Sequence, residues 1–437
     1  MAESRKTVPI SASFEKWSWR ESRDGVRKES GNQLPQSKQI ATVERRGCPK
    51  REAGAPAEIH PCGSPLRIVV RSARQPGSFL VPLFRSSRSP KKRTVARHEH
   101  LVFYPSYGMR TPDGLGWTLV VQGSVFDPRI SWLRRKPVFA VIRRVLRMDR
   151  TAEEYFRVRM RQFLMFGLRG RFITVRIGDH DRLVGESDYM GQFRGEISLT
   201  HAELSPVLPR SASAAEWLPY QAILNEADDR VIPGRLQLIE PTGISIISDV
   251  DDTIKHSNVP NRGDLFRNTF TRTFVPIAGM PELYRDCAQA GAAFHFVSGS
   301  PWQLYEPLSE FLREEGYPAG SFHLKRFRIR DSARKIRMSP QKTHKRAAIE
   351  PILAAFPQRK FVLIGDSGEQ DPEIYASFLR ERPQQIAGVF IRAVREETRA
   401  ADRLQAAFAG LDPRGWIVYR EPTEIRDQVA SLVRGTT

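Results

Sequence analysis

The feature that most constrains the fold is an apolar, β-branched run that stops abruptly at acidic residues. Residues 244–257 have the sequence ISIISDVDDTIKHS, in which a run of isoleucines meets Asp249, Asp251 and Asp252. The run offers little polar surface, which is typical of a buried parallel strand. Carboxylates at the carboxyl end of such a strand lie at the crevice where open α/β sheets bind ligands. Because alternate residues of an extended segment share one side, we expect Asp249 and Asp251 to reach one phosphate or metal ion together.

Two later strand-like segments also end in polar residues. Residues 292–300 (AAFHFVSGS) lead to Ser298, and residues 360–371 (KFVLIGDSGEQD) contain Asp366, with Asp371 five positions later. Both segments are apolar up to these positions, as buried strands are. The sequence therefore predicts three strand ends that carry polar side chains to one edge of a sheet.

A helix is predicted for residues 339–356, with Lys342 and Lys345 near its start. Lys345 is favoured as a phosphate-binding residue because it lies one turn before Ile349, at the start of an apolar helix face. Lys342 competes for the same role, and the sequence does not decide between them.

Acids after one strand, a serine after another, a lysine at a helix start and a GDxxxxD segment occur in this order in the haloacid-dehalogenase-like phosphohydrolases, which the chain resembles. The strings ISDVDDTIKHSNV, VSGSPWQLYEPLSEFL and FVLIGDSGEQDPEIY narrow the resemblance to the catalytic domain of the actin-patch phosphatidate phosphatase family. The resemblance covers residues 240–437 well and residues 100–240 more loosely. It implies an enzyme that uses Mg²⁺ to hydrolyse phosphatidate to diacylglycerol and phosphate.

The resemblance also implies catalytic roles for four residues. Asp249 would attack phosphorus and form an aspartyl-phosphate, and Asp251 would act first as general acid and then as general base. The negative charge beside it would favour a protonated Asp251. Ser298 would donate to a phosphate oxygen, and Lys345 would supply positive charge.

A magnesium site is implied at the same strand ends, because Mg²⁺ prefers oxygen ligands. The resemblance assigns to it the Asp249 carboxylate, the backbone carbonyl of Asp251, and Asp366, with Asp371 orienting water or the lysine. Asp252 and Glu369 are interpreted as solvated acids and are left out of the site.

The predicted fold class is α/β, with a Rossmann-like parallel sheet of the haloacid-dehalogenase type. Strands near residues 244–250, 292–298, 360–366, 386–392 and 415–420 alternate with helices near residues 280–290, 302–315, 341–356, 373–382 and 395–408, a pattern typical of parallel sheets. The short spacing between the motifs leaves no room for a large cap domain. An open site would suit a bulky substrate or one seated in a bilayer.

Three domains or segments are predicted. Residues 1–98 form a basic extension expected to be disordered, since residues 1–100 carry 21 Lys and Arg against 9 Asp and Glu without sustained periodicity. Residues 99–240 alternate polar and apolar positions as a β-sandwich-like accessory domain does. Within them, residues 132–150 form a basic amphipathic insertion that could lie on anionic lipid. Residues 241–437 form the catalytic domain.

Composition limits the remaining possibilities. The chain has 437 residues and a formal charge of +20, only 3 cysteines, no apolar run long enough to span a membrane, and no secretory signal at its start. We therefore expect a cytoplasmic protein that acts peripherally on an anionic phospholipid surface and binds no nucleic acid; protein partners cannot be assigned. Two alternatives stay open: a phosphatase of another phosphomonoester, such as a phosphoprotein or a small metabolite, and a non-catalytic basic scaffold that binds membranes or nucleic acid.

Overall fold

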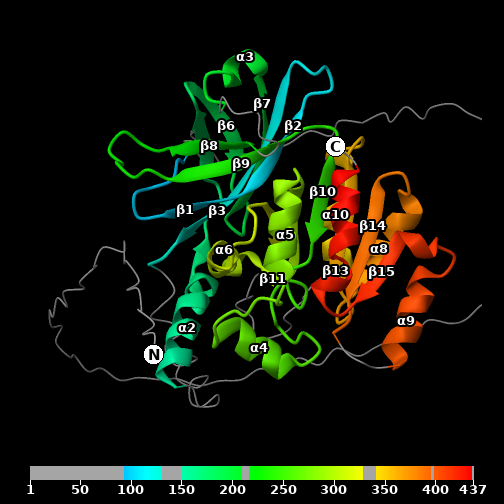
Figure 1. Cartoon of the computed structure of the whole chain (residues 1–437). Helices are drawn as coiled ribbons and strands as arrows, with labels where there is room; N and C mark the ends of the chain where they lie inside the picture. The colour runs from blue at the N-terminus through cyan, green and yellow to red at the C-terminus, as the bar shows by residue number, and fades with distance from the viewer. Residues whose placement is uncertain (1–92, 130–148, 209–215, 328–340, 395–397, 436–437) are drawn as a thin grey trace, which may run out of the picture. The chain divides into compact units, whose positions relative to one another are not determined.

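The computed structural model describes residues 93–129, 149–208, 216–327, 341–394 and 398–435, which all belong to one compact unit, Arg85–Thr437. The predicted basic extension, up to residue 92, and the predicted amphipathic insertion, up to residue 148, lie outside the described residues. The described residues carry two β-sheets and the helices packed on them (Figure 1).

The first half of the described chain forms a curled nine-stranded sheet in the order β1-β3-β2-β9-β8-β5-β6, with β4 and β7 also paired to β3. Its strands are β1 (His100–Tyr104), β2 (Ser106–Arg110), β3 (Gly116–Asp127), β4 (Phe166–Gly167), β5 (Phe172–Ile177), β6 (His180–Glu186), β7 (Gln192–Thr200), β8 (Glu216–Ile223) and β9 (Pro233–Ile239). Every pair is antiparallel except β2 with β9. The alternating segments predicted from sequence are therefore strands, and they join in one hydrogen-bonded network through β3. The connections include α2 (Arg150–Arg161), η1 (Gln162–Leu164) and α3 (His201–Leu204).

The second half forms a six-stranded sheet in the order β12-β11-β10-β13-β14-β15, and all of its pairs are parallel. Its strands are β10 (Ile244–Ser248), β11 (Ala293–Pro301), β12 (Ser321–Lys325), β13 (Lys360–Asp366), β14 (Ile386–Arg392) and β15 (Trp416–Tyr419). The predicted α/β class with a parallel sheet is confirmed. The sequence prediction missed β12, a five-residue strand that ends in Lys325 rather than in an acid or a serine.

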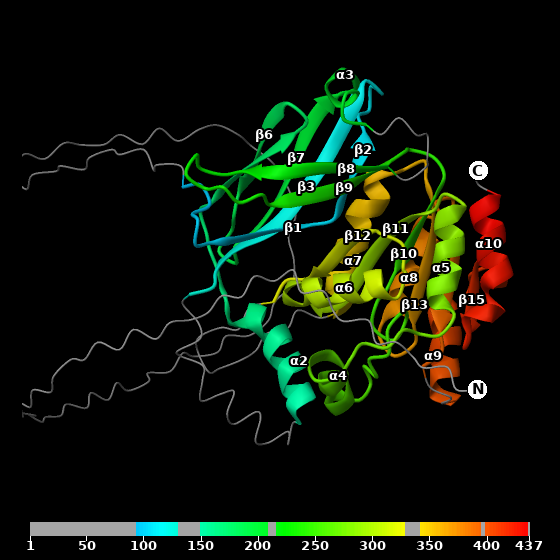
Figure 2. The same ribbon diagram turned by 60° about the vertical axis from the view of Figure 1, so that its left-hand side comes forward.

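Helices cover both faces of this parallel sheet (Figures 1 and 2). One face packs on α5 (Met280–Gln289), α6 (Tyr305–Glu314) and α10 (Arg426–Arg434), and the other on α7 (Gln341–Ala355), α8 (Asp371–Glu381) and α9 (Thr398–Phe408). The neighbouring residues Ile246 and Ile247 are both fully buried but belong to different apolar clusters, because successive strand residues point to opposite faces. This burial on both sides explains the continuous apolar run in the sequence. The remaining helical elements are α4 (Arg262–Phe270), η2 (Trp302–Leu304), η3 (Pro413–Gly415) and η4 (Pro422–Glu424).

The two sheets are joined by specific contacts. The backbone N–H of Phe322 donates to the carbonyl of Pro105 at 3.1 Å, and Gln122 Nε2 donates to the carbonyl of Phe322 at 3.0 Å. The ring of Tyr104 stacks on Trp302 with centroids 4.0 Å apart. The curled sheet therefore closes part of the apolar core of the parallel sheet.

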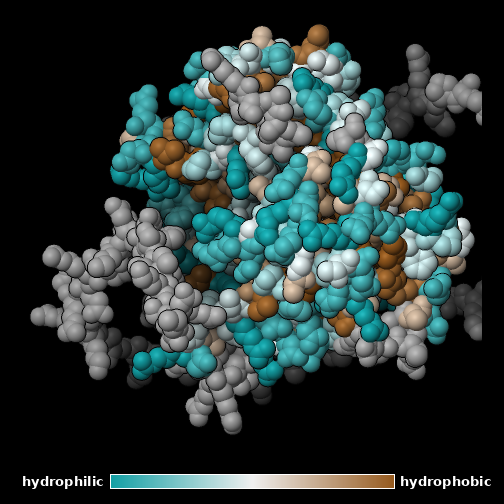
Figure 3. All heavy atoms as spheres, viewed as in Figure 1, coloured by the Kyte–Doolittle hydropathy of each residue, from teal (hydrophilic) through white to brown (hydrophobic). Residues whose placement is uncertain are grey.

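The surface visible in Figure 3 is mainly hydrophilic, with hydrophobic residues in small separate patches. Within the described ranges, every helix is too short or too polar to cross a bilayer.

Candidate active site

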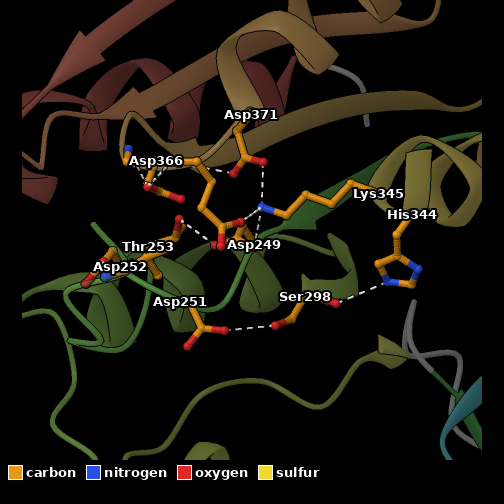
Figure 4. Close-up of polar contacts among 12 residues, drawn as sticks. Asp249, Asp251, Asp252, Thr253, Ser298, His344, Lys345, Asp366 and Asp371 are labelled. Atoms are coloured by element: carbon orange, nitrogen blue, oxygen red, sulfur yellow. Dashed lines mark hydrogen bonds and ion pairs between the residues drawn. The ribbon is translucent and has the colours of Figure 1, made fainter. Parts of the chain in front are cut away.

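The three central strands of the parallel sheet bring the predicted polar residues to one place. β10 lies between β11 and β13, and Asp249 follows β10, with its backbone N–H donating to the carbonyl of Ile364 at 2.9 Å. Ser298 lies in β11, and Asp366 ends β13. Because these strands are parallel, their carboxyl ends meet at one edge, and Figure 4 shows the side chains directed toward each other there.

Lys345 of α7 contributes the positive charge at the centre of this site. Its Nζ lies 2.7 Å from Asp249 Oδ1, 2.7 Å from Glu369 Oε2 and 2.5 Å from Asp371 Oδ1. The lysine side chain is only 1% exposed. The side chain of the alternative candidate, Lys342, lies outside the described residues.

Burial and mutual repulsion set the electrostatics of this group. Burial raises the pKa of the Asp249 carboxyl well above its usual value, and the nearby carboxylates of Asp371 and Glu369 raise it further, against the opposing effect of Lys345. Burial alone would lower the pKa of Lys345, but Asp249, Asp371 and Glu369 hold it well above its usual value. Lys345 is therefore charged at physiological pH, and it offsets part of the negative charge of the three acids.

A divalent cation fits among three of the carboxylates. Oxygen atoms of Asp249, Asp366 and Glu369 all lie within 4.8 Å of one another, and all three residues are buried. Asp366 Oδ1 accepts hydrogen bonds from the backbone N–H groups of Gly368 (2.6 Å) and Glu369 (3.1 Å), whereas its buried Oδ2 has no hydrogen-bond partner among the described residues. A hard cation such as Mg²⁺ is satisfied by such an all-oxygen donor set. The residues present therefore fit a metal ion.

Asp371 lies beside these acids but faces the lysine. Its Oδ1 contacts Lys345 Nζ, and its Oδ2 accepts from the backbone N–H of Asp366 at 3.3 Å. A Cβ on Gly365 would lie 2.4 Å from Asp371 Oδ2, so only glycine allows this approach. Asp371 therefore contacts the lysine, and its roles toward lysine, water and metal stay predictions.

The carboxylate of Asp251 is directed to a different set of partners. Its Oδ2 accepts from Ser298 Oγ at 3.0 Å and from Ser300 Oγ at 2.9 Å. Its Oδ1 accepts from Ser257 Oγ at 2.6 Å and pairs with Lys255 Nζ at 2.9 Å. Thus the structure brings together Asp251 and Ser298 as predicted, through a direct hydrogen bond.

Lys255 is a buried residue of the site that the sequence analysis did not single out. It is 1% exposed, and its Nζ lies 4.8 Å from the centroid of the Phe274 ring. Burial alone would raise the pKa of the Asp251 carboxyl, but the Lys255 ammonium and the hydroxyl donors lower it well below its usual range. The expectation that neighbouring charge keeps Asp251 protonated is therefore wrong for the resting site. The four-residue spacing from Asp251 to Lys255 was the available signal.

Two acids that were interpreted as solvated are buried. Glu369 belongs to the acidic triad described above, and burial raises the pKa of its carboxyl. Asp252 has a positive φ of 57° and accepts from the backbone N–H groups of Ser257, Asn258 and Val259 at 2.8, 2.7 and 2.6 Å. Asp252 therefore shapes the turn that carries Lys255 and Ser257 rather than contacting solvent.

Two further side chains complete the site. The hydroxyl of Thr253 donates to Asp249 Oδ2 at 3.2 Å, which places Thr253 against the predicted nucleophile. His344 donates from Nε2 to the carbonyl of Ser298 at 3.2 Å, and burial lowers its pKa to about 4, so it is neutral at physiological pH. Both contacts are drawn in Figure 4.

The segment that carries this site is similar to known proteins. Residues 244–393 match the family model described as phosphatidate phosphatase APP1, catalytic domain. This segment is similar to the catalytic domain of that family. The matched residues include every side chain of the APP1-like site named above, from Asp249 to Asp371.

The relatives are similar over only part of their length. The chain is 36% identical over 159 residues to phosphatidate phosphatase APP1 of Saccharomyces cerevisiae, which covers 35% of this chain and 26% of the yeast protein. It is 32% identical over 255 residues to an uncharacterized protein of Schizosaccharomyces pombe, covering 55% of this chain and 41% of that protein. The chain thus spans less than half the length of either relative. Among solved structures, the Pnkp1/Rnl/Hen1 complex matches 35% of this chain and 46% of the compared chain at 15% identity, with a TM-score of 0.23 that is too low to carry an argument.

Proposed function

We propose that this protein is a Mg²⁺-dependent phosphatidate phosphatase that works through an aspartyl-phosphate on Asp249. The observation that carries the proposal is the buried pairing of Asp249 with Lys345 at 2.7 Å. Asp249 is also a member of the metal-competent triad, and the whole group lies within the family-matched segment. Phosphoryl transfer requires mainly positioning and charge stabilisation, and this site concentrates both.

Two aspartates divide the proposed chemistry. In the first step, a carboxylate oxygen of Asp249 bonds to phosphorus while the phosphorus–oxygen bond to diacylglycerol breaks, and Asp251 gives its proton to the departing oxygen. In the second step, water attacks the phosphorus, Asp251 takes a proton from that water, and phosphate leaves as the Asp249 carboxylate is restored. Ser298 and Lys345 bind the phosphoryl oxygens.

The first step requires a proton on Asp251, although Lys255 favours its ionised form. A substrate phosphate bound at Ser298 brings negative charge beside Asp251, which raises the pKa of its carboxyl against the effect of Lys255. Proton uptake by Asp251 is then coupled to substrate binding, and the ionised state is restored once phosphate leaves.

The metal would be held by Asp249 and Asp366, with Glu369 and the Asp251 carbonyl as further oxygen ligands and Asp371 orienting a water or Lys345. Bound there, Mg²⁺ would offset the negative charge of the phosphoryl group and of the acids around it. The proposal is supported by the unpartnered Oδ2 of Asp366 and by the all-oxygen donor set.

Phosphatidate is proposed as the substrate because the matched family and the yeast relative carry that name. The substrate is itself an anionic lipid, so we propose that the protein works in the cytoplasm on an anionic phospholipid surface. We further propose that residues 241–437 form the catalytic domain, residues 99–240 an accessory domain and residues 1–98 a basic extension.

Phosphate release from phosphatidate vesicles, with and without Mg²⁺, tests the proposal. The native chain should release phosphate only with Mg²⁺, and Asp249→Asn should reduce the rate by at least about 10³-fold, as loss of a nucleophile does. Soluble phosphomonoesters run in parallel distinguish a phosphatase of another substrate. Equal turnover by the native chain and Asp249→Asn would reject the mechanism, and hydrolysis of soluble esters alone would reject the lipid substrate.

A further inference from the structure

The loop between β13 and α8 follows directly on Asp366 and carries Glu369, and a residue of α9 holds it. Arg403 Nη1 donates to the carbonyl of Ser367 at 3.0 Å, and its Nη2 donates to the carbonyl of Glu369. The same guanidinium forms a two-pronged ion pair with Glu373 of α8, at 2.6 Å from Nε to Oε1 and 2.7 Å from Nη2 to Oε2. One side chain therefore ties α9, α8 and the loop together.

These contacts bear directly on where the triad oxygens lie. Glu369 is held through its own carbonyl, while its carboxylate meets Asp249 and Asp366 within 4.8 Å. The acids of the triad repel each other, and this repulsion favours movement of the loop away from the other acids. Two hydrogen bonds to Glu373 fix the orientation of the planar guanidinium. The Arg403 side chain can therefore hold the two loop carbonyls in place.

We propose that Arg403 is a positioning residue for Mg²⁺ binding, which it supports by holding the loop that follows Asp366 and carries Glu369. The inference rests on the metal site of the proposed function. α9 (Thr398–Phe408) lies beyond residues 244–393, so the family match does not include this residue. Removing a group that orients metal ligands without touching the metal typically weakens metal affinity by about 10–100-fold.

A purely structural role would consist of docking α9 on α8, and the chain offers a matched control for it. Arg380 of α8 donates from Nη2 to the carbonyls of Ala407 and Ala409, at 2.6 and 3.0 Å. It joins the same two helices through carbonyl hydrogen bonds but contacts no residue of the loop between Asp366 and Asp371 in these bonds. Arg380→Gln therefore removes helix docking and leaves the loop clamp intact.

The experiment measures the melting temperature of the full-length chain over a range of MgCl₂ concentrations, for the native protein, Arg403→Gln, Arg380→Gln and Asp366→Asn. The Kd for Mg²⁺ obtained from the rise of melting temperature with MgCl₂ concentration should increase about 10–100-fold for Arg403→Gln and should stay within threefold of the native value for Arg380→Gln. Because the clamp acts through the metal site, phosphate release by Arg403→Gln should recover in excess Mg²⁺ with an unchanged KM for substrate. If Arg403→Gln does not fold, Arg403→Lys replaces it, since lysine keeps the charge but loses the fork.

The failure of this inference and the failure of the proposed function give different results. A native chain that Mg²⁺ stabilises, together with an Arg403 variant that shows the native Mg²⁺ dependence, overturns the role of Arg403 alone. An equal shift in Arg380→Gln also overturns it, because helix docking would then explain the effect. If the native chain and Asp366→Asn respond identically to Mg²⁺, the proposed metal site itself is wrong.

Discussion

Neutralising Asp366 should make the metal-free protein more stable. Asp366 is fully buried and lies within 4.8 Å of carboxylate oxygens of Asp249 and Glu369. Two unit charges at that distance repel by about 3.5 kcal/mol at an effective dielectric constant of 20. Burial and the nearby acids Asp371 and Glu369 accordingly raise the pKa of the Asp366 carboxyl well above its usual value.

Asparagine removes this repulsion and keeps the local hydrogen bonds. Its side-chain oxygen can accept from the N–H groups of Gly368 and Glu369 as Asp366 Oδ1 does, and its NH₂ replaces the partnerless Oδ2 with a donor facing acidic oxygens. Lys345 already offsets part of the charge on Asp249 and Glu369. We therefore expect the free energy of unfolding to rise by about 3 kcal/mol, close to the repulsion of one carboxylate pair. For a unit of this size that is about 3–6 °C in melting temperature.

The stability difference between Asp366→Asn and the native protein should depend on pH and on bound Mg²⁺. The folded-state pKa of Asp366 is raised above the unfolded value of about 3.9, so the fold binds more protons than the unfolded chain and its stability falls as pH rises above about 4. The advantage of Asp366→Asn in EDTA should therefore be near zero at pH 4 and largest at pH 8. Mg²⁺ should reverse the order, because only the native protein keeps the ligand. A metal at about 1,000 times its Kd adds about 4.1 kcal/mol, which exceeds the gain of about 3 kcal/mol from the substitution.

Melting curves at pH 5 and pH 8, each in EDTA and in saturating MgCl₂, measure both effects. Asp181→Asn serves as a control, since Asp181 is an exposed surface acid paired with Arg176. A variant that is less stable than the native protein in EDTA at pH 8 would refute the repulsion argument. A variant that Mg²⁺ stabilises as much as the native chain would refute the assignment of Asp366 to the metal.

Three further substitutions test other buried charges. Lys345→Met should lower the free energy of unfolding by about 3–5 kcal/mol because it leaves buried carboxylates unpaired, and an unchanged urea midpoint would contradict this. Burial lowers the pKa of His295 to about 3. The free energy of unfolding should therefore fall by about 2 kcal/mol between pH 7 and pH 5 because of this residue. His295→Phe should remove that part of the pH dependence of urea unfolding. Arg159→Met should lower the free energy of unfolding by about 2 kcal/mol, because Arg159 donates from α2 to the carbonyls of Thr269 and Arg272 at 2.8 and 2.6 Å. Amide hydrogen exchange in α4 should then become faster. Unchanged exchange would show that α2 does not hold α4.

The sequence predicted the parallel sheet and the meeting of its strand ends because both follow from local pattern. Continuous apolar runs need burial on two faces, and a parallel sheet then places Asp249, Ser298 and Asp366 at one edge without further information. The lysine could be found in the same way, since Lys345 begins an apolar helix face.

The assignments that failed depended on contacts across the chain. Asp252 and Glu369 look like solvated acids in a charged turn, and only the folded loops show that backbone N–H groups surround one and carboxylates the other. Lys255 follows an isoleucine in a short turn and has no helical or strand pattern to announce its burial. Such residues are identified by their partners in the folded chain, and the four-residue spacing from Asp251 to Lys255 does not by itself give this pairing.

Two buried lysines separate the acids of the site into groups with different electrostatics. Lys345 pairs with Asp249, Glu369 and Asp371, and Lys255 pairs with Asp251. Asp366 forms no ion pair among the described residues, although it lies among the other acids. Its charge can be offset by a proton or by a metal cation, and each excludes the other at Oδ2. Metal binding at this site should therefore release a proton, and its apparent affinity should fall as the pH is lowered, which the same melting curves will show as a weaker response to Mg²⁺ at pH 5 than at pH 8.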